Sequence, residues 1–136
     1  MKNKWYNLND EEIKKVPAEP GAYKISRFGK NETPIEINRF FGMDKEGIID
    51  IGESKNLRER LRSFKRNIEN GKGGHMAGWR YHYLKLQNKI PFLKFSYEVC
   101  KTKEEAYKKE NAMMKKYVEK HKELPPLNYK YNWSEE

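Results

Sequence analysis

The residues best suited to chemistry in this chain are basic side chains at the start of a helix. The segment from Gly47 to Leu61 reads GIIDIGESKNLRERL, an apolar run followed by a glycine and a helix start. The apolar run predicts a buried strand that ends at Gly52. Asn56, with Glu59 three residues later, predicts a capping box. Amides at a helix N-terminus favour an anion, and the arginines that follow point to phosphate.

One arginine of this helix differs from the others. The helical repeat of about 100° per residue places Arg60 at the edge of an apolar stripe that packs on a sheet. Its stem can lie on the core while the guanidinium reaches a cleft beside the sheet, although an ordinary snorkelling arginine has the same pattern. The stripe consists of Leu57, Leu61, Phe64 and Ile68.

The other basic residues of this region are expected to contact nucleic acid from a solvated face and from the glycine-rich loop that follows. His75 follows that loop and is either a phosphate contact or a plain surface histidine. The expected contacts are Lys55, Arg58, Arg62, Lys65, Arg66, Lys72 and His75.

A carboxylate on a second, longer predicted helix is the other candidate. Ala106, Met113 and Tyr117 share an apolar stripe, and Glu110 lies in the middle of it. A carboxylate that faces a core is costly unless it is paired, hydrogen-bonded or bound to a metal. The pattern leaves open a buried salt bridge, for example with Arg60, a helix rotated slightly from this projection, and a functional carboxylate.

The elements that must position these residues follow from periodicity and from turn residues. Alternation predicts strands at 21–28, 34–41 and 93–100, besides the buried strand at 48–51. Helices are predicted from Asn56 to about Ile68 and from Thr102 to before Pro125, whereas residues 75–86 fit a helix or a strand. This order predicts one α+β domain with a small, mainly antiparallel sheet flanked by helices. We expect residues 1–19 to be an extension packed on a domain formed by residues 20–136.

Composition narrows the class of partner. The 136 residues carry a net charge of +9, which suits a polyanion such as nucleic acid. No apolar segment approaches the length that spans a membrane, and no signal peptide is recognisable, so we expect no membrane partner and a cytoplasmic location. The single cysteine excludes a disulfide framework and fits a reducing compartment. No obligate protein partner is evident from the sequence.

Five features, taken in chain order, resemble the motifs of the GIY-YIG nuclease domain. They are Gly21-Ala22-Tyr23 after Pro20, the second motif Asp50-Ile51-Gly52, Arg60 eight residues beyond Gly52, Glu110 on a later helix, and Asn128 within PPLN. The resemblance runs from about Pro20 to Asn128.

The chain departs from that family in three places. Asp50 replaces the tyrosine that opens the second motif, and Phe64 stands where the family often has a histidine. The interval between the two motifs is long. We therefore expect a three-stranded core sheet with residues 34–41 as an inserted strand that forms a hairpin on it.

The resemblance implies a divalent-metal-dependent endonuclease that hydrolyses DNA phosphodiester bonds. Glu110 would hold Mg²⁺ or Mn²⁺, and Arg60 would bind the phosphate oxygens. Tyr23 would position or deprotonate the attacking water, and Asn128 would join the nucleic-acid contacts. Asp50 would act as a general base, supply a second metal oxygen, or mark a site that no longer cuts. The alternative is a catalytically inactive module that binds nucleic acid.

Overall fold

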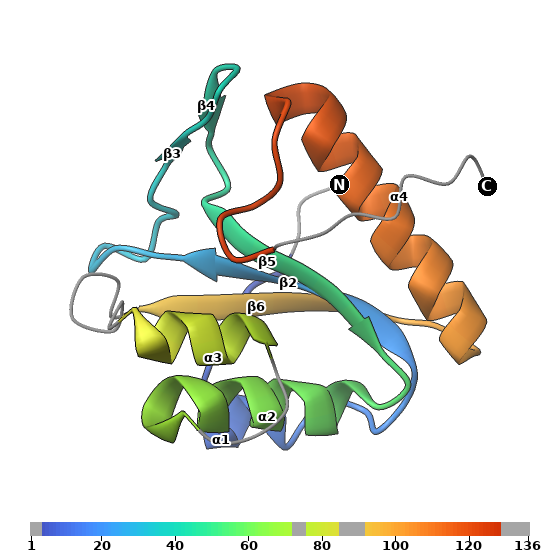
Figure 1. Ribbon diagram of the computed structural model, residues 1–136. Helices are drawn as coiled ribbons and strands as arrows, with labels where there is room; N and C mark the ends of the chain where they lie inside the picture. The colour runs from blue at the N-terminus through green and yellow to red at the C-terminus, as the bar shows by residue number, and fades with distance from the viewer. Residues whose placement is uncertain (1–3, 72–75, 85–91, 129–136) are drawn as a thin grey trace.

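The computed structural model describes residues 4–71, 76–84 and 92–128. A four-stranded antiparallel sheet separates two groups of helices, with α1, α2 and α3 on one face and α4 on the other (Figure 1). The strand order is β1 (Tyr6–Asn7), β6 (Leu93–Val99), β2 (Gly21–Arg27) and β5 (Ile48–Ser54). The predicted α+β class with an antiparallel sheet flanked by helices is therefore confirmed.

Two of the helices, α2 and α4, begin where the sequence predicts caps. The helices are α1 (Asp10–Ile13), α2 (Leu57–Asn70), α3 (Met76–Tyr83) and α4 (Lys103–His121). The Asn56 side chain accepts a hydrogen bond from the Glu59 amide at 3.1 Å, which caps α2 as expected. Thr102 caps α4 in the same way, through the amide of Glu105 at 3.0 Å.

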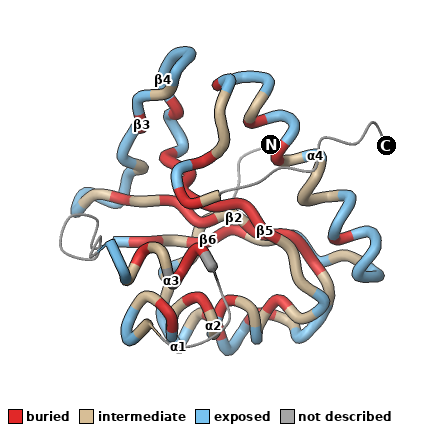
Figure 2. Tube along the Cα trace, viewed as in Figure 1, coloured by how far each residue is buried: buried red, intermediate tan, exposed pale blue. Residues whose placement is uncertain are grey.

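Each face of the sheet is covered by its own apolar cluster, and the buried residues concentrate along the strands (Figure 2). The cluster under α2 and α3 is the larger one; it includes Tyr23, Ile25 and Phe95 from the sheet and Leu57, Leu61, Phe64 and Tyr81 from the helices. The cluster under α4 consists of Ile48, Ile51, Met114 and Tyr117. Side chains alternate along β2, so that Tyr23 and Ile25 share the larger cluster. In β5 the register shifts opposite Ile25 and Ser26, and Ile48 and Ile51 both reach the cluster under α4.

The predicted strand at 34–41 is corrected by the structure. This segment forms a separate hairpin, β3 (Ile37–Asn38) paired with β4 (Met43–Asp44), which stands apart from the main sheet (Figure 1). The fourth strand of the main sheet comes instead from the N-terminal segment, because β1 pairs with β6. The hairpin was expected, but its place on the sheet was wrong.

Two further predictions change. Strand β5 does not end at Gly52 but continues to Ser54, because Gly52 keeps its pairing with Tyr23 of β2. Within the ambiguous segment 75–86, Met76–Tyr83 forms a helix, α3, and residues 75 and 85–91 lie outside the described part of the chain. Within the described residues, no helix has the length and apolar character needed to cross a membrane.

Candidate active site

The site is organised around a tyrosine that lies across a glycine. Tyr23 of β2 pairs with Gly52 of β5 and is 1% exposed. A Cβ atom added to Gly52 would collide with the ring and the hydroxyl of Tyr23. Only glycine therefore lets the phenol lie flat over the neighbouring strand, which fixes the direction of its hydroxyl.

Asp50 lies on the same face of β5 as Gly52, since the two are separated by one residue. It is 3% exposed. Burial raises the pKa of the Asp50 carboxyl to about 8, and the negative charge of Glu110 adds to the rise. The charges of Arg60 and Arg80 and the amide of Ile51 act in the opposite direction. At neutral pH this carboxyl is close to its titration point.

Arg60 reaches this site from α2, as its position at the edge of the apolar stripe predicts. Its side chain donates a hydrogen bond to the Tyr23 hydroxyl. The Nε atom of Arg60 is buried and has no hydrogen-bond partner in the part of the chain that the structure describes. A buried N–H donor of this kind is costly unless a ligand accepts from it.

The pKa of Tyr23 is raised far above its ordinary value. Burial is the largest cause, and the negative charges of Asp50 and Glu110 add to it, while Arg60 opposes the shift through its charge and its hydrogen bond. The Tyr23 phenol is therefore protonated at neutral pH. In this state it donates and accepts hydrogen bonds but does not remove a proton from water.

Glu110 reaches the site from α4, on the opposite side of the sheet from α2. It is half-buried and lies between the buried residues Ala106 and Met114 on the face of α4 that packs on the sheet. The stripe is rotated slightly from the projection, because Met114 rather than Met113 is fully buried. The charge of Glu110 acts on both Asp50 and Tyr23, so it lies close to both groups.

The oxygen atoms gathered here suit a hard divalent cation. Two carboxylates, Asp50 and Glu110, act on one another electrostatically. No cluster of three or more His, Cys, Asp and Glu side chains suitable for a metal ion is found within the described ranges. Mg²⁺ is commonly bound through only one or two carboxylates and keeps several waters. The donor set therefore fits Mg²⁺ better than a cation that needs a complete protein cage.

Arg80 is a member of the site that the sequence analysis missed. It belongs to α3, its charge acts on Asp50, and its Nη1 atom donates to the Leu127 carbonyl at 2.6 Å. Arg80 follows buried Ala77 by three residues and precedes buried Tyr81 by one. Arg60 has the same offsets from the apolar stripe of α2. The ambiguity between helix and strand at 75–86 concealed this signal.

The basic residues of α2 expected to contact nucleic acid differ in what they contact within the protein. Arg58 is partly buried and donates from Nε to the Val16 carbonyl at 2.8 Å, which ties the N-terminal segment to α2. The pairs of Arg62 with Glu59 at 3.2 Å and of Lys65 with Glu69 at 2.7 Å are local ion pairs. Lys55 and Arg66 are exposed, and Lys72 and His75 lie outside the described residues.

Asn128 is placed against the site by contacts with the backbone. Its amide oxygen accepts from the Ile51 N–H and its amide nitrogen donates to the Ile51 carbonyl, both at 3.0 Å. The Leu127 amide also donates to the Ile49 carbonyl at 2.8 Å. The C-terminal segment therefore holds the backbone on either side of Asp50, and within the described chain Asn128 acts as a structural clamp on β5.

No family model and no curated protein matches this sequence. The chain is similar to solved structures of the GIY-YIG N-terminal endonuclease domain of UvrC from Thermotoga maritima. The magnesium-bound domain is 25% identical over 89% of this chain and 100% of that chain, with a TM-score of 0.48. A point mutant of that domain, bound to its catalytic divalent cation, is 23% identical over 90% of this chain and 100% of that chain, with a TM-score of 0.49.

The structures found are GIY-YIG domains, the kind of domain that the motif order of this chain resembles. Because these TM-scores lie below 0.5, the function proposed below rests on the geometry of this chain's own residues.

Proposed function

We propose that this chain is an endonuclease that hydrolyses DNA phosphodiester bonds with a divalent cation. The observation that carries the proposal is the mutual electrostatic influence of four side chains from four separate elements. They are Tyr23 of β2, Asp50 of β5, Arg60 of α2 and Glu110 of α4. Such a concentration of coupled titratable groups is typical of an active site.

Arg60 is the phosphate-binding group in this proposal. The hydrogen bond to Tyr23 orients the guanidinium before substrate arrives, and the buried Nε donor has no partner among the described residues. A guanidinium binds phosphate oxygens through paired donors. As negative charge builds on those oxygens in the transition state, an oriented cation stabilises it without further reorganisation.

Asp50 is the better proton acceptor of the two candidates. A general base works best when its pKa lies near the working pH, and the pKa of Asp50 is about 8. The pKa of Tyr23 is far above that range, so the phenol orients the attacking water and does not deprotonate it. On this basis an aspartate can take the chemical role at the position where the GIY-YIG family has a second tyrosine.

Glu110 would hold the divalent cation through its carboxylate, with waters as the remaining ligands. The cation, when bound, supplies charge that polarises the scissile phosphate and stabilises the leaving oxygen. Positive charge on the exposed surface, including Lys55 and Arg66, would attract the DNA backbone.

The test is nicking of supercoiled plasmid by the purified chain with Mg²⁺ or Mn²⁺. Glu110→Gln and Arg60→Lys are expected to reduce the rate by about a hundredfold or more, as expected for removal of a transition-state contact. The matched control is Glu119→Gln, an exposed glutamate on the same helix, which should leave the rate within about twofold. Plasmid binding without nicking under either metal would contradict the proposal and favour a silent binding module.

A further inference from the structure

The hairpin β3–β4 carries two phenylalanines at its tip. Phe40 is 76% exposed and Phe41 is 55% exposed, and their rings pack on each other with centroids 5.3 Å apart. The tip is a tight turn in which the Arg39 amide donates to the Gly42 carbonyl at 3.0 Å, with Gly42 at φ +72°. Turn tips normally carry small or polar residues. Two large apolar side chains in this place indicate an interaction surface.

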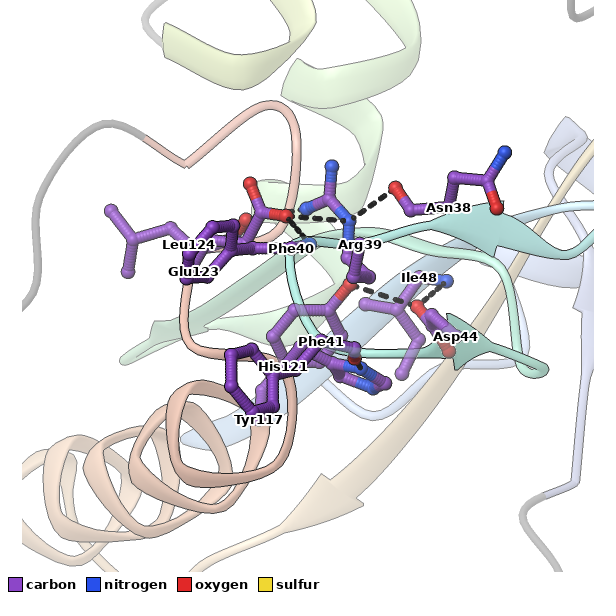
Figure 3. Close-up of polar contacts among 10 residues, drawn as sticks. All are labelled: Asn38, Arg39, Phe40, Phe41, Asp44, Ile48, Tyr117, His121, Glu123 and Leu124. Carbon is purple, nitrogen blue, oxygen red and sulfur yellow. Dashed lines mark hydrogen bonds and ion pairs between the residues drawn. The ribbon is translucent and has the colours of Figure 1, made fainter.

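The tip is held rigidly by the end of α4 (Figure 3). The Arg39 guanidinium pairs with Glu123 at 3.5 Å and donates to the Leu124 carbonyl at 2.8 Å. The Phe40 amide donates to the Glu123 carboxylate, and the Phe41 amide donates to the carbonyl of His121 at 3.3 Å. Four contacts therefore fix the backbone of the two phenylalanines before any partner binds.

A second anchor lies at the base of the hairpin. Asp44 is 3% exposed, and its Oδ2 atom accepts from the Tyr117 hydroxyl and from the Ile48 amide, each at 2.9 Å (Figure 3). Tyr117 belongs to α4 and Ile48 begins β5, so this carboxylate joins the hairpin to the two elements that also carry Glu110 and Asp50. The tip therefore has a fixed position relative to the candidate active site.

That position can be expressed on the scale of DNA. His121, whose carbonyl receives the Phe41 amide, lies eleven residues after Glu110 on α4. At 1.5 Å per residue the separation along the helix is about 16 Å, or about five base-pair steps of 3.4 Å. The hairpin tip and Glu110 are therefore separated along the helix axis by less than the length of one short duplex.

The charge around the tip favours a polyanion. Glu123 is neutralised by Arg39, whereas the Lys122 ammonium lies 5.9 Å from the centroid of the Phe41 ring and is exposed. Lys120 and Lys45 are also exposed, each next to an exposed glutamate (Glu119 and Glu46), within a chain of net charge +9. Exposed phenylalanines flanked by lysines suit a base stack bordered by phosphates better than the apolar groove of a protein partner.

We propose that Phe40 and Phe41 form a wedge that enters the base stack of duplex DNA about five base pairs from the cleaved bond. The wedge unstacks one base step and favours sites that deform easily, such as pyrimidine–purine steps and mismatches. The inference deepens the proposed function and rests on it, because the duplex is the substrate of the active site described above.

The experiment measures unstacking in EDTA, where no cleavage is expected. The full chain is added to short duplexes of one sequence, each with a single 2-aminopurine, whose fluorescence rises when it leaves the stack. We expect a rise of about threefold or more at one or two adjacent positions. The double variant Phe40→Ser, Phe41→Ser should abolish this rise while binding the same duplex within about tenfold of the wild-type Kd. The matched control is Ile35→Ser, because Ile35 is an exposed apolar residue that precedes β3 and lies away from the tip. This variant should keep the rise in fluorescence.

The possible outcomes distinguish the wedge from its alternatives. A bound duplex without a rise, or a rise that survives the double variant, overturns the wedge. A wild-type dimer that the double variant converts to a monomer assigns the tip to a protein interface and also overturns it. A rise without Mg²⁺-dependent cleavage keeps the wedge and refutes the nuclease, whereas cleavage without a rise does the reverse. Equal melting temperatures for the variants and the wild type confirm that they fold.

Discussion

The substitution Asp50→Asn distinguishes the effect of the buried Asp50 carboxyl on stability from its effect on the cleavage rate. In the folded chain the pKa of Asp50 is about 8, against an ordinary value of 3.8, so between these two pH values the folded state holds one proton more than the unfolded state. The free energy of unfolding therefore falls as pH rises through this window. One pKa unit corresponds to about 1.4 kcal/mol. From about pH 5 to pH 8 the wild type should lose up to about 4 kcal/mol that the asparagine variant keeps.

The assay is urea unfolding followed by tryptophan fluorescence, in EDTA, for the wild type and Asp50→Asn at both pH values. Taking the difference between the two proteins at each pH cancels the titration of every other group that behaves alike in both. The variant should thus be the more stable protein at pH 8. Its cleavage rate with Mg²⁺ should nevertheless fall by more than about tenfold, because asparagine does not accept a proton from water.

Equal pH dependence for the two proteins would refute the buried-charge reasoning. An unchanged cleavage rate in a stabilised variant would instead show that Asp50 has no chemical role. We expect one substitution to raise stability and lower activity where a functional group carries a charge that is unfavourable when buried.

Three further substitutions test the supports of the site. Gly52→Ala should destabilise the fold by about 1–3 kcal/mol in urea unfolding, because the new methyl group displaces the Tyr23 ring, and should also reduce cleavage. Asn128→Ala should cost about 1–3 kcal/mol in the same measurement, since two backbone groups of β5 lose their partners; an unaltered urea midpoint would contradict the clamp. Arg80→Ala should raise the pKa of Asp50 further and shift the pH–rate profile of cleavage upward, whereas Arg80→Lys should restore most of the wild-type profile.

The parts of the site that the sequence predicted are those determined by local periodicity. The helical repeat marks Arg60 as the one arginine at the edge of an apolar stripe and Glu110 as a carboxylate within one, and in the structure the charges of both act on Asp50. The cap residues Asn56 and Thr102 likewise depend on neighbours three residues away. Helix faces and helix caps can therefore be predicted from residues that are close together in the sequence.

The parts that could not be predicted depend on residues far apart in the chain. Arg58 has the position of a solvated arginine on α2, but a carbonyl from residue 16 captures its guanidinium. Residues 34–41 alternate as a sheet strand does, yet Arg39 donates a hydrogen bond to Leu124, 85 positions away, and the hairpin is separate from the main sheet. The local sequence around Arg58 or Arg39 does not reveal the distant carbonyl that each side chain contacts. Periodicity alone therefore predicts the wrong environment for both arginines.

The clamp at Leu127 and Asn128 also has a consequence for self-association. Strand β5 is an edge of the main sheet, and an open edge presents unpaired amides and carbonyls to any other strand. Leu127 occupies the Ile49 carbonyl, and the Asn128 amide pairs with Ile51 as a neighbouring strand would. A short irregular segment therefore closes the edge beside Asp50, so that a second copy of the chain cannot extend the sheet across the candidate active site.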